Sequence, residues 1–189
     1  VVPAPEVAID WEFGRGQLNV LGFAISPEEA VAIRCLPDDY SPQEYHSLFK
    51  AVQQVAEGPS RKITQNGIVE TTWLARYGIH TENVSHDTMW AMKFLHPEFD
   101  RGLDNVGRVY TEFPYWKDDN EDWTNIRDWN QHLVYNCKDT TGTFAAYLSQ
   151  TEALHSRNLH SLFQWVMRFF PVIQEMCTTG LRVSPTSLT

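Results

Sequence analysis

The stretch from Val7 to Glu12 reads Val-Ala-Ile-Asp-Trp-Glu, a short apolar run that carries two acidic side chains. In a strand, alternate side chains point to the same face, so Asp10 and Glu12 would share one face. Ile9 and Trp11 would face the other way. Two carboxylates on one face of a buried strand repel each other unless a divalent cation lies between them, and Mg²⁺ and Mn²⁺ prefer oxygen ligands of this kind. A strand edge with two solvated acids fits the stretch equally well. Residues elsewhere in the chain are needed to distinguish this interpretation from a metal site.

Apolar patterns in the first part of the chain predict a sheet with helices packed on it. One helix is predicted from the Ser41 cap to Gly58-Pro59, and a second over 68–77 that stops at Gly78. Short turns between the first three predicted strands favour an antiparallel meander. The 189 residues, 42% of them hydrophobic, suffice for one α/β domain. Strands are predicted over 7–12, 18–25, 30–33 and 62–64.

Beyond Gly78 the predicted elements are helices. Asp87 is a good N-cap for a helix over 88–95, and capping explains its carboxylate better than metal binding does. Residues 113–122 have no periodicity, which predicts an ordered surface loop. Further helices are predicted over about 103–109, 126–147 and 159–176, the last interrupted at Pro171.

Charge and cysteine content narrow the class of function. The formal net charge of -9 argues against a phosphate-binding surface spread over the whole molecule, so a nucleic-acid substrate would need metal ions and a few local cations. The three cysteines form no CxxC pair, which favours a reducing compartment over a disulfide framework or a zinc site.

No apolar run approaches a membrane span, and we expect no membrane contact. The chain begins Val-Val and ends in a Ser/Thr-rich tail, from which we expect a piece of a longer protein.

Two further pairs of polar residues lie one helical turn apart. Tyr135 and Asp139 are four positions apart in a predicted long helix, which places them on the same face. Asn66 and Glu70 have the same spacing at a predicted helix start. With the two strand acids, the chain offers four carboxylates as oxygen ligands and a tyrosine beside the last. A phosphodiesterase that uses two metal ions needs this inventory, because carboxylates hold the ions and a donor positions the attacking water.

These three pairs, in this order along the chain, resemble the three exonuclease motifs of the DEDDy group of 3′→5′ exonucleases. The residues around them are similar to the proofreading domain of family A DNA polymerases, especially phage-type ones. Residues 163–184 resemble the segment where the polymerase part of that family begins, so the resemblance covers nearly the whole chain. The similar segments are His86-Asp-Thr-Met89, Gly102-Leu-Asp104, Phe113-Pro-Tyr-Trp-Lys-Asp118 and Tyr135-Asn-Cys-Lys-Asp-Thr140.

The resemblance implies an α/β fold with an RNase H-like mixed β-sheet flanked by α-helices, the DnaQ-like exonuclease fold. It implies an exonuclease domain over 1–150 and, over 151–189, a C-terminal helix that leads toward a polymerase domain of the same longer chain. The expected reaction is two-metal hydrolysis that removes nucleoside 5′-monophosphates from single-stranded or mismatched DNA 3′ ends, as in proofreading. The expected place of action is the cytoplasm of a bacterium or of a phage-infected host cell.

The resemblance also assigns roles to single residues. Asp10, Glu12 and Asp139 would act in catalysis and bind two divalent ions, Mg²⁺ or Mn²⁺, with Asp10 between the ions. Glu70 would help to hold the second ion. Tyr135 would orient the attacking water.

Two positions depart from the family pattern. Glu70 stands where the second motif of the family has aspartate, which predicts attenuated activity. Phe13 follows the first motif where the family has threonine, which removes a hydroxyl near the terminal sugar and adds a surface for base stacking. The other expected substrate contacts are Asn66, Trp116 and Lys117.

Two other functions fit the sequence less directly. One is a free-standing DEDDy nuclease that trims RNA, against which the polymerase-like segment at 163–184 speaks. The other is a catalytically weakened or silent RNase H-like domain that binds single-stranded nucleic acid or braces a polymerase. The intact acids and tyrosine argue against a silent domain, because converging buried polar groups are costly to keep.

Overall fold

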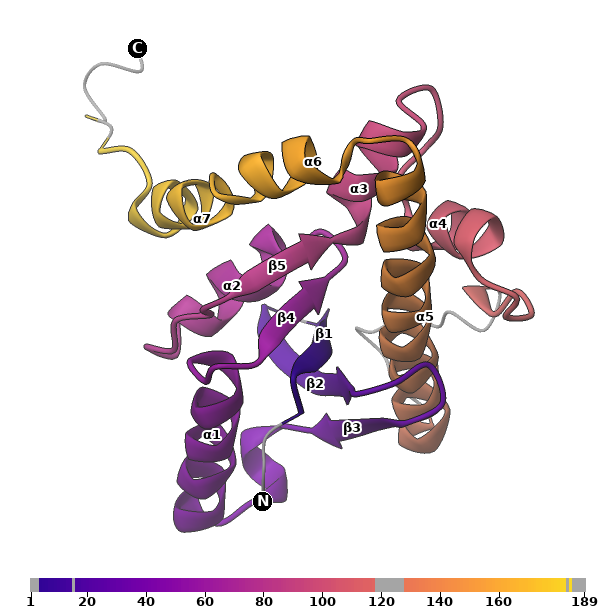
Figure 1. Ribbon diagram of the computed structural model, residues 1–189. Helices are drawn as coiled ribbons and strands as arrows, with labels where there is room; N and C mark the ends of the chain where they lie inside the picture. The colour runs from indigo at the N-terminus through magenta and orange to yellow at the C-terminus, as the bar shows by residue number, and fades with distance from the viewer. Residues whose placement is uncertain (1–3, 15, 118–127, 183, 185–189) are drawn as a thin grey trace.

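The acidic strand lies in the middle of a mixed sheet. The computed structural model describes residues 4–14, 16–117, 128–182 and 184. Within these residues five strands form one sheet in the order β3-β2-β1-β4-β5 (Figure 1). Strands β1, β2 and β3 are joined in antiparallel pairs, which confirms the predicted meander, and β4 and β5 run parallel to β1. The strands are β1 (Glu6–Gly14), β2 (Gln17–Ala24), β3 (Ala30–Arg34), β4 (Arg61–Thr64) and β5 (Val84–Asp87).

Strand β5 was not predicted from the sequence, which indicated a mainly helical chain beyond Gly78. Its four residues, Val-Ser-His-Asp, pair with β4 in parallel. His86 and Asp87 are buried and have polar partners; His86 Nε2, for example, lies 3.0 Å from Gln150 Oε1. A strand whose buried residues are polar and hydrogen-bonded has no hydrophobic pattern by which it can be detected.

The predicted helices are present, with some shifts at their ends. Ser41 caps the first helix in a capping box, since its hydroxyl accepts from Glu44 N at 3.3 Å and its N–H donates to Glu44 Oε2 at 2.9 Å. Pro171 lies in the first turn of the last helix, and the predicted interruption falls just before it. The helices are α1 (Pro42–Ala56), α2 (Ile68–Ala75), α3 (Thr88–Leu95), α4 (Leu103–Tyr110), α5 (Trp129–Ser156), α6 (His160–Met167) and α7 (Phe170–Thr179), with a 3₁₀ turn η1 at Pro37–Asp39.

Helix α5 is longer than predicted. It continues beyond Tyr147 to Ser156 because no glycine or proline interrupts the segment between them. The domain boundary expected at residue 150 therefore falls inside this helix. The predicted start at residue 126 and the residues 118–122 of the predicted loop lie outside the described residues.

Alternate residues of β1 face different environments. Ile9 and Trp11 are 1% and 3% exposed and belong to an apolar core that includes residues of α1 and α2. Asp10 and Glu12 face α5, from which Asn136 Nδ2 donates to Asp10 Oδ2 at 2.8 Å. The alternation expected of a strand thus places both acids on the α5 side of the sheet.

A glycine in β2 allows α5 to lie close to the sheet. A Cβ on Gly22 would lie 2.2 Å from Asn136 Oδ1 and 2.5 Å from Thr140 Oγ1, closer than any side chain can approach. Gly22 is paired with Asp10 in the neighbouring strand. The close contact therefore brings the buried face of α5 over the acidic part of β1.

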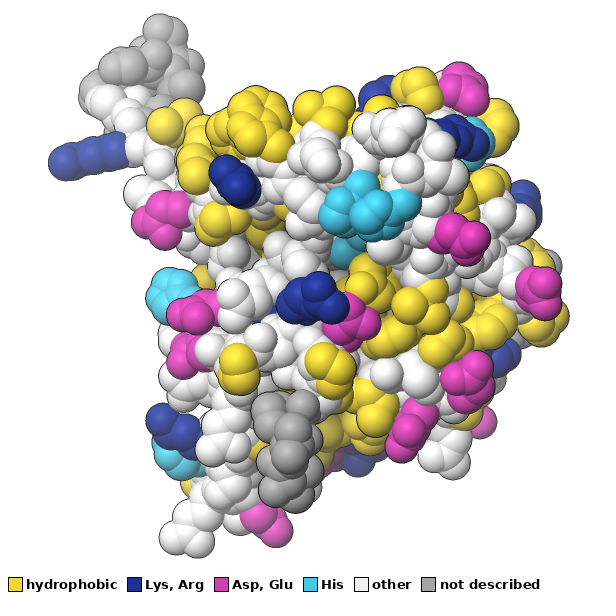
Figure 2. All heavy atoms as spheres, viewed as in Figure 1, with side chains coloured by type: hydrophobic (Ala, Val, Ile, Leu, Met, Phe, Trp, Pro, Cys, Tyr) yellow, Lys and Arg dark blue, Asp and Glu magenta, His cyan; other side chains and the backbone are white. Residues whose placement is uncertain are grey.

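The α6 and α7 helices leave many apolar side chains in solvent. Figure 2 shows hydrophobic side chains gathered over these helices, along one edge of the molecule. The exposed members include Leu162, Trp165, Phe169, Val172 and Met176. None of the helices in the described ranges has the length and apolar character needed to cross a bilayer.

Candidate active site

Three carboxylates from distant parts of the chain converge beside the sheet. Asp10 and Glu12 come from β1 and Asp139 from α5, and each offers one oxygen within 4.8 Å of the others. Asp10 is 9% exposed and Asp139 is 4% exposed, so the acids meet below the molecular surface. The structure therefore brings together three of the four acids that the sequence singled out; we call them the acid cluster.

The carboxyl groups of the acid cluster have raised pKa values, because they are buried and lie close together. Burial, and then Asp139, raise the pKa of Asp10 to about 8. Burial, and then Asp10 and Asp139, raise the pKa of Glu12 to about 9. Burial also raises the pKa of Asp139. Oxygen donors held this close in a buried site fit a hard divalent cation such as Mg²⁺ or Mn²⁺, which would stabilise all three as carboxylates.

Tyr135 lies one turn before Asp139 on the same buried face of α5, as predicted. Burial, and then Asp139, raise the pKa of its phenol to about 12, so the hydroxyl stays protonated at neutral pH. Asn136, the next residue, holds Asp10 by the hydrogen bond described above and was not predicted from the sequence. Its only sequence signal is its position on the helix face that carries Asp139 and Thr140.

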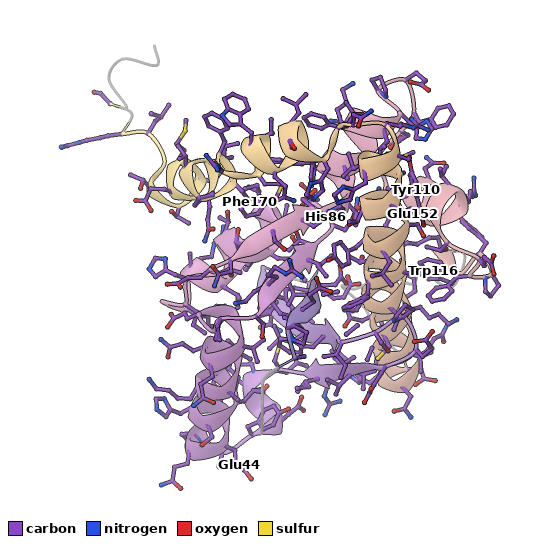
Figure 3. All side chains as sticks on the ribbon, viewed as in Figure 1. Glu44, His86, Tyr110, Trp116, Glu152 and Phe170 are labelled. Carbon is purple, nitrogen blue, oxygen red and sulfur yellow. The ribbon has the colours of Figure 1, made fainter. Side chains whose placement is uncertain are left out.

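Trp116, which the sequence suggested as a substrate contact, is buried beside the acid cluster. It is 6% exposed, and its indole N–H donates to Asp139 Oδ1. Figure 3 shows Trp116 beside α5, on the segment that follows α4. A Cβ on Gly142 would lie 2.8 Å from its ring, so the glycine in α5 makes room for the indole. Gly142 inside a predicted helix was the sequence signal for this close packing.

The Lys117 ammonium also lies at the acid cluster instead of pointing outward. Its Nζ is 2.7 Å from Asp139 Oδ1 and 2.6 Å from Oδ2, and it donates to the Tyr135 hydroxyl at 3.0 Å. This Lys117–Asp139 ion pair is largely buried, with 18% and 6% of the two side chains exposed. In this structure Lys117 therefore offsets part of the negative charge of the cluster.

Glu70, the fourth predicted ligand, is buried on α2 near the cluster but outside it. Burial, and then Asp10, raise its pKa well above the usual range. Within the described part of the chain, Glu70 Oε2 has no hydrogen-bond partner. A buried carboxyl oxygen without a partner next to an acid cluster is suited to a further cation or its water.

Asp87 has the capping role that we predicted and a second role. Its Oδ1 accepts from Trp90 N at 3.0 Å at the start of α3. Its Oδ2 accepts from Gly67 N at 2.7 Å and from Thr64 Oγ1 at 2.9 Å, which fixes the turn before α2. Asp87 thus helps to position Glu70 and is not itself part of the acid cluster.

Of the remaining predicted substrate contacts, Asn66 lies in this turn and Phe13 lies near the end of β1. Asn66 is exposed in the left-handed conformation, with φ of 60°, just before α2. Phe13 is half-buried after a bulge that separates it from Glu12, and its ring stacks on Trp73 of α2 with centroids 4.6 Å apart. Arg76 lies over the Trp73 ring at 4.1 Å. The roles of Asn66 and Phe13 in substrate binding stay predictions.

Comparison with solved structures shows the fold. NrnC of Brucella melitensis in a structure bound to pGG is 20% identical, with a TM-score of 0.73, and the match covers 94% of this chain and 86% of NrnC. The Pol1 POL domain of M. smegmatis with DNA primer-template and dNTP is 14% identical, with a TM-score of 0.70, covering 94% of this chain and 28% of that one. The catalytic core of RRP6 from Trypanosoma brucei is 19% identical, with a TM-score of 0.65, covering 85% and 44%.

Another structure of NrnC, with bound Mg²⁺, matches with a TM-score of 0.73 at 18% identity. The mixed five-stranded sheet flanked by helices is thus the RNase H-like fold of DEDD exonucleases, as the sequence predicted. No protein-family model matches the chain, and no curated protein matches it either.

Proposed function

We propose that this chain is a metal-dependent 3′→5′ exonuclease that removes nucleoside 5′-monophosphates from single-stranded or mismatched DNA ends. The observation that carries the proposal is the buried acid cluster of Asp10, Glu12 and Asp139, with oxygens within 4.8 Å of one another. The fold supports it, because the sheet and α5 hold these acids in an RNase H-like arrangement. A purely structural site would have little use for three acids that repel one another, two of them buried.

In the proposed site the acid cluster holds the metal, and Glu70 approaches it from α2. When bound, two Mg²⁺ or Mn²⁺ ions would supply positive charge that activates water and offsets charge on the leaving 3′-oxygen. Tyr135, protonated at neutral pH, would donate a hydrogen bond that orients the attacking water. Asn136 keeps Asp10 in place, and the Trp116 indole does the same for Asp139.

The preference for DNA, the proofreading role and the polymerase partner are parts of the proposal that come from the sequence resemblance. The similarity to the Pol1 structure supports them. So does the exposed apolar side of α6 and α7, which a polymerase domain of the same longer chain would cover. We place this activity in the cytoplasm of a bacterium or of a phage-infected cell.

A second candidate is a free-standing nuclease that acts on short oligonucleotides. It is favoured by the match to NrnC bound to pGG, because this chain covers 86% of NrnC but only 28% of the Pol1 chain. Both candidates use the same acid cluster, so they differ in substrate and not in chemistry.

Digestion of matched substrates tests the proposal. With Mn²⁺, 5′-labelled single-stranded DNA should shorten from its 3′ end faster than matched duplex, because opening a terminal pair costs a few kcal/mol. A duplex with a mismatched 3′ end should fall between the two. Faster hydrolysis of pGG or of RNA of the same sequence would favour the second candidate. If blunt matched duplex were the best substrate, proofreading would be the wrong assignment.

A further inference from the structure

The Lys117 ammonium lies where a cation would bind to both oxygens of Asp139. Its distances to Oδ1 and Oδ2, 2.7 and 2.6 Å, are nearly equal, so Nζ lies between the two oxygens. The same Nζ is 3.0 Å from the Tyr135 hydroxyl and 4.9 Å from the centre of the Tyr135 ring. A cation in this position offsets the charge of the Asp139 carboxylate.

The neighbouring segment holds Lys117 in this position. The indole of Trp116, one residue earlier, is packed against Gly107 and Gly142. Its N–H also donates to Asp139 Oδ1, so two consecutive residues point their side chains at one carboxylate. This arrangement is a built site for an ammonium ion, and not a long surface side chain that happens to lie near an acid.

A divalent ion chelated by both oxygens of Asp139 would need the place that the Lys117 ammonium occupies. Mg²⁺ binds carboxylate oxygens at about 2.0–2.1 Å and tolerates little departure from octahedral geometry. An ammonium group between the same two oxygens would be in repulsive contact with that ion. The two cations therefore exclude each other at this end of the acid cluster.

We infer that Lys117 is a built-in cation that holds the Asp139 end of the acid cluster in the metal-free protein and has to leave before a divalent ion binds there. The inference rests on the proposed metal-binding role of the cluster. Lys117 is a positioning residue, because it keeps Asp139 and Tyr135 in place. It also sets the concentration of metal that the site requires.

Mn²⁺ binding without nucleic acid tests this inference. Free Mn²⁺ is measured by electron paramagnetic resonance during titration of the full chain and of Lys117→Met and Lys117→Arg. Lys117→Met should bind Mn²⁺ at least about tenfold more tightly, because the competing charge is gone. Lys117→Arg, which keeps the charge, should stay close to wild type. Equal or weaker binding by Lys117→Met would overturn the inference.

Lys93→Met is the matched control for net charge. Lys93 is an exposed lysine on α3 whose Nζ donates to Pro97 O at 2.9 Å. Its removal should change Mn²⁺ affinity much less, because charges outside a site are largely screened. An equal gain from Lys93→Met would mean that overall charge, and not the place of Lys117, controls metal binding.

Lysine acetylation of the unmutated protein gives a second test that does not depend on how the variants fold. Mass spectrometry should find Lys117 more reactive at saturating Mn²⁺ than in chelator, while Lys50, exposed on α1, serves as the reference. Unchanged Lys117 reactivity would overturn the inference. If wild type binds Mn²⁺ and only the Lys117 results fail, the proposed function stands; if wild type binds no Mn²⁺, both fail.

Discussion

Replacing Asp10 with alanine should lower the rate of 3′-end hydrolysis by at least about a thousandfold, because this carboxylate is one of the three that would hold the divalent cation. Asp10 offers an oxygen within 4.8 Å of those of Glu12 on its own strand and Asp139 on α5. The measurement is the release of nucleotides from 5′-labelled single-stranded DNA at saturating Mn²⁺.

A substitution at Asp10 should also raise the thermal stability of the protein when no metal is present. Burial, and then Asp139, raise the pKa of Asp10 to about 8. A carboxyl group with a raised pKa stabilises the folded state below its unfolded pKa of about 4, and this contribution is lost as the pH rises toward the folded value. The melting temperature of Asp10→Asn should therefore exceed that of wild type by a margin that grows between about pH 6 and pH 8, measured in chelator. The asparagine can still accept the hydrogen bond from Asn136.

Glu152→Ala is the control for both measurements. Glu152 is an exposed acid on α5, the helix that carries Asp139 (Figure 3). Its removal changes the net charge by the same amount and should leave both hydrolysis and the pH profile of melting close to wild type. Substantial hydrolysis by Asp10→Ala would show that the acid cluster is not the active site.

Changing Glu70 to aspartate should raise the rate, by up to about a hundredfold, and lower the metal concentration required. Glutamate is longer by one methylene, so its carboxylate reaches roughly an ångström further or folds back into a less common rotamer. Catalytic geometry tolerates about 0.5 Å of displacement. In the structure Glu70 is buried, lies outside the acid cluster, and has an oxygen without a hydrogen-bond partner in the described part of the chain.

Rates with Mg²⁺ and Mn²⁺ are the measurement for Glu70. The wild type should prefer Mn²⁺, which accepts irregular oxygen ligation more readily than Mg²⁺, and Glu70→Asp should reduce that preference. Glu70→Gln, which keeps the length and removes the charge, should be slower than wild type with either ion. A slower Glu70→Asp under Mg²⁺ would mean that the site is built around glutamate, and our interpretation of it as a poor fit would be wrong.

Sequence patterns were sufficient where one local rule controls the structure. Alternation in β1 predicted that Asp10 and Glu12 share a face, and the cap at Ser41 predicted where α1 begins. The spacing of Tyr135 and Asp139 predicted that both lie on one side of α5. These features depend on neighbours in the chain and not on the tertiary structure.

The features that the sequence did not predict depend on contacts between distant segments. Strand β5 is held by polar contacts such as that of His86 with Gln150, which leave no apolar pattern. Trp116 is buried because Gly142, far along the chain, leaves space for its ring. Lys117 is the next residue after Trp116, and its ammonium also contacts Asp139. A segment that was predicted to be a surface loop therefore supplies a cation to the acid cluster.

A crystal of the protein with Mn²⁺ and a short single-stranded DNA tests the central claim most directly. Anomalous scattering should place Mn²⁺ between Asp10, Glu12 and Asp139, with the 3′-terminal phosphodiester beside it and the Tyr135 hydroxyl facing that phosphate. Mn²⁺ bound elsewhere, or an oligonucleotide whose 5′ end enters the acid cluster, would contradict the assignment of this chain as a 3′→5′ exonuclease.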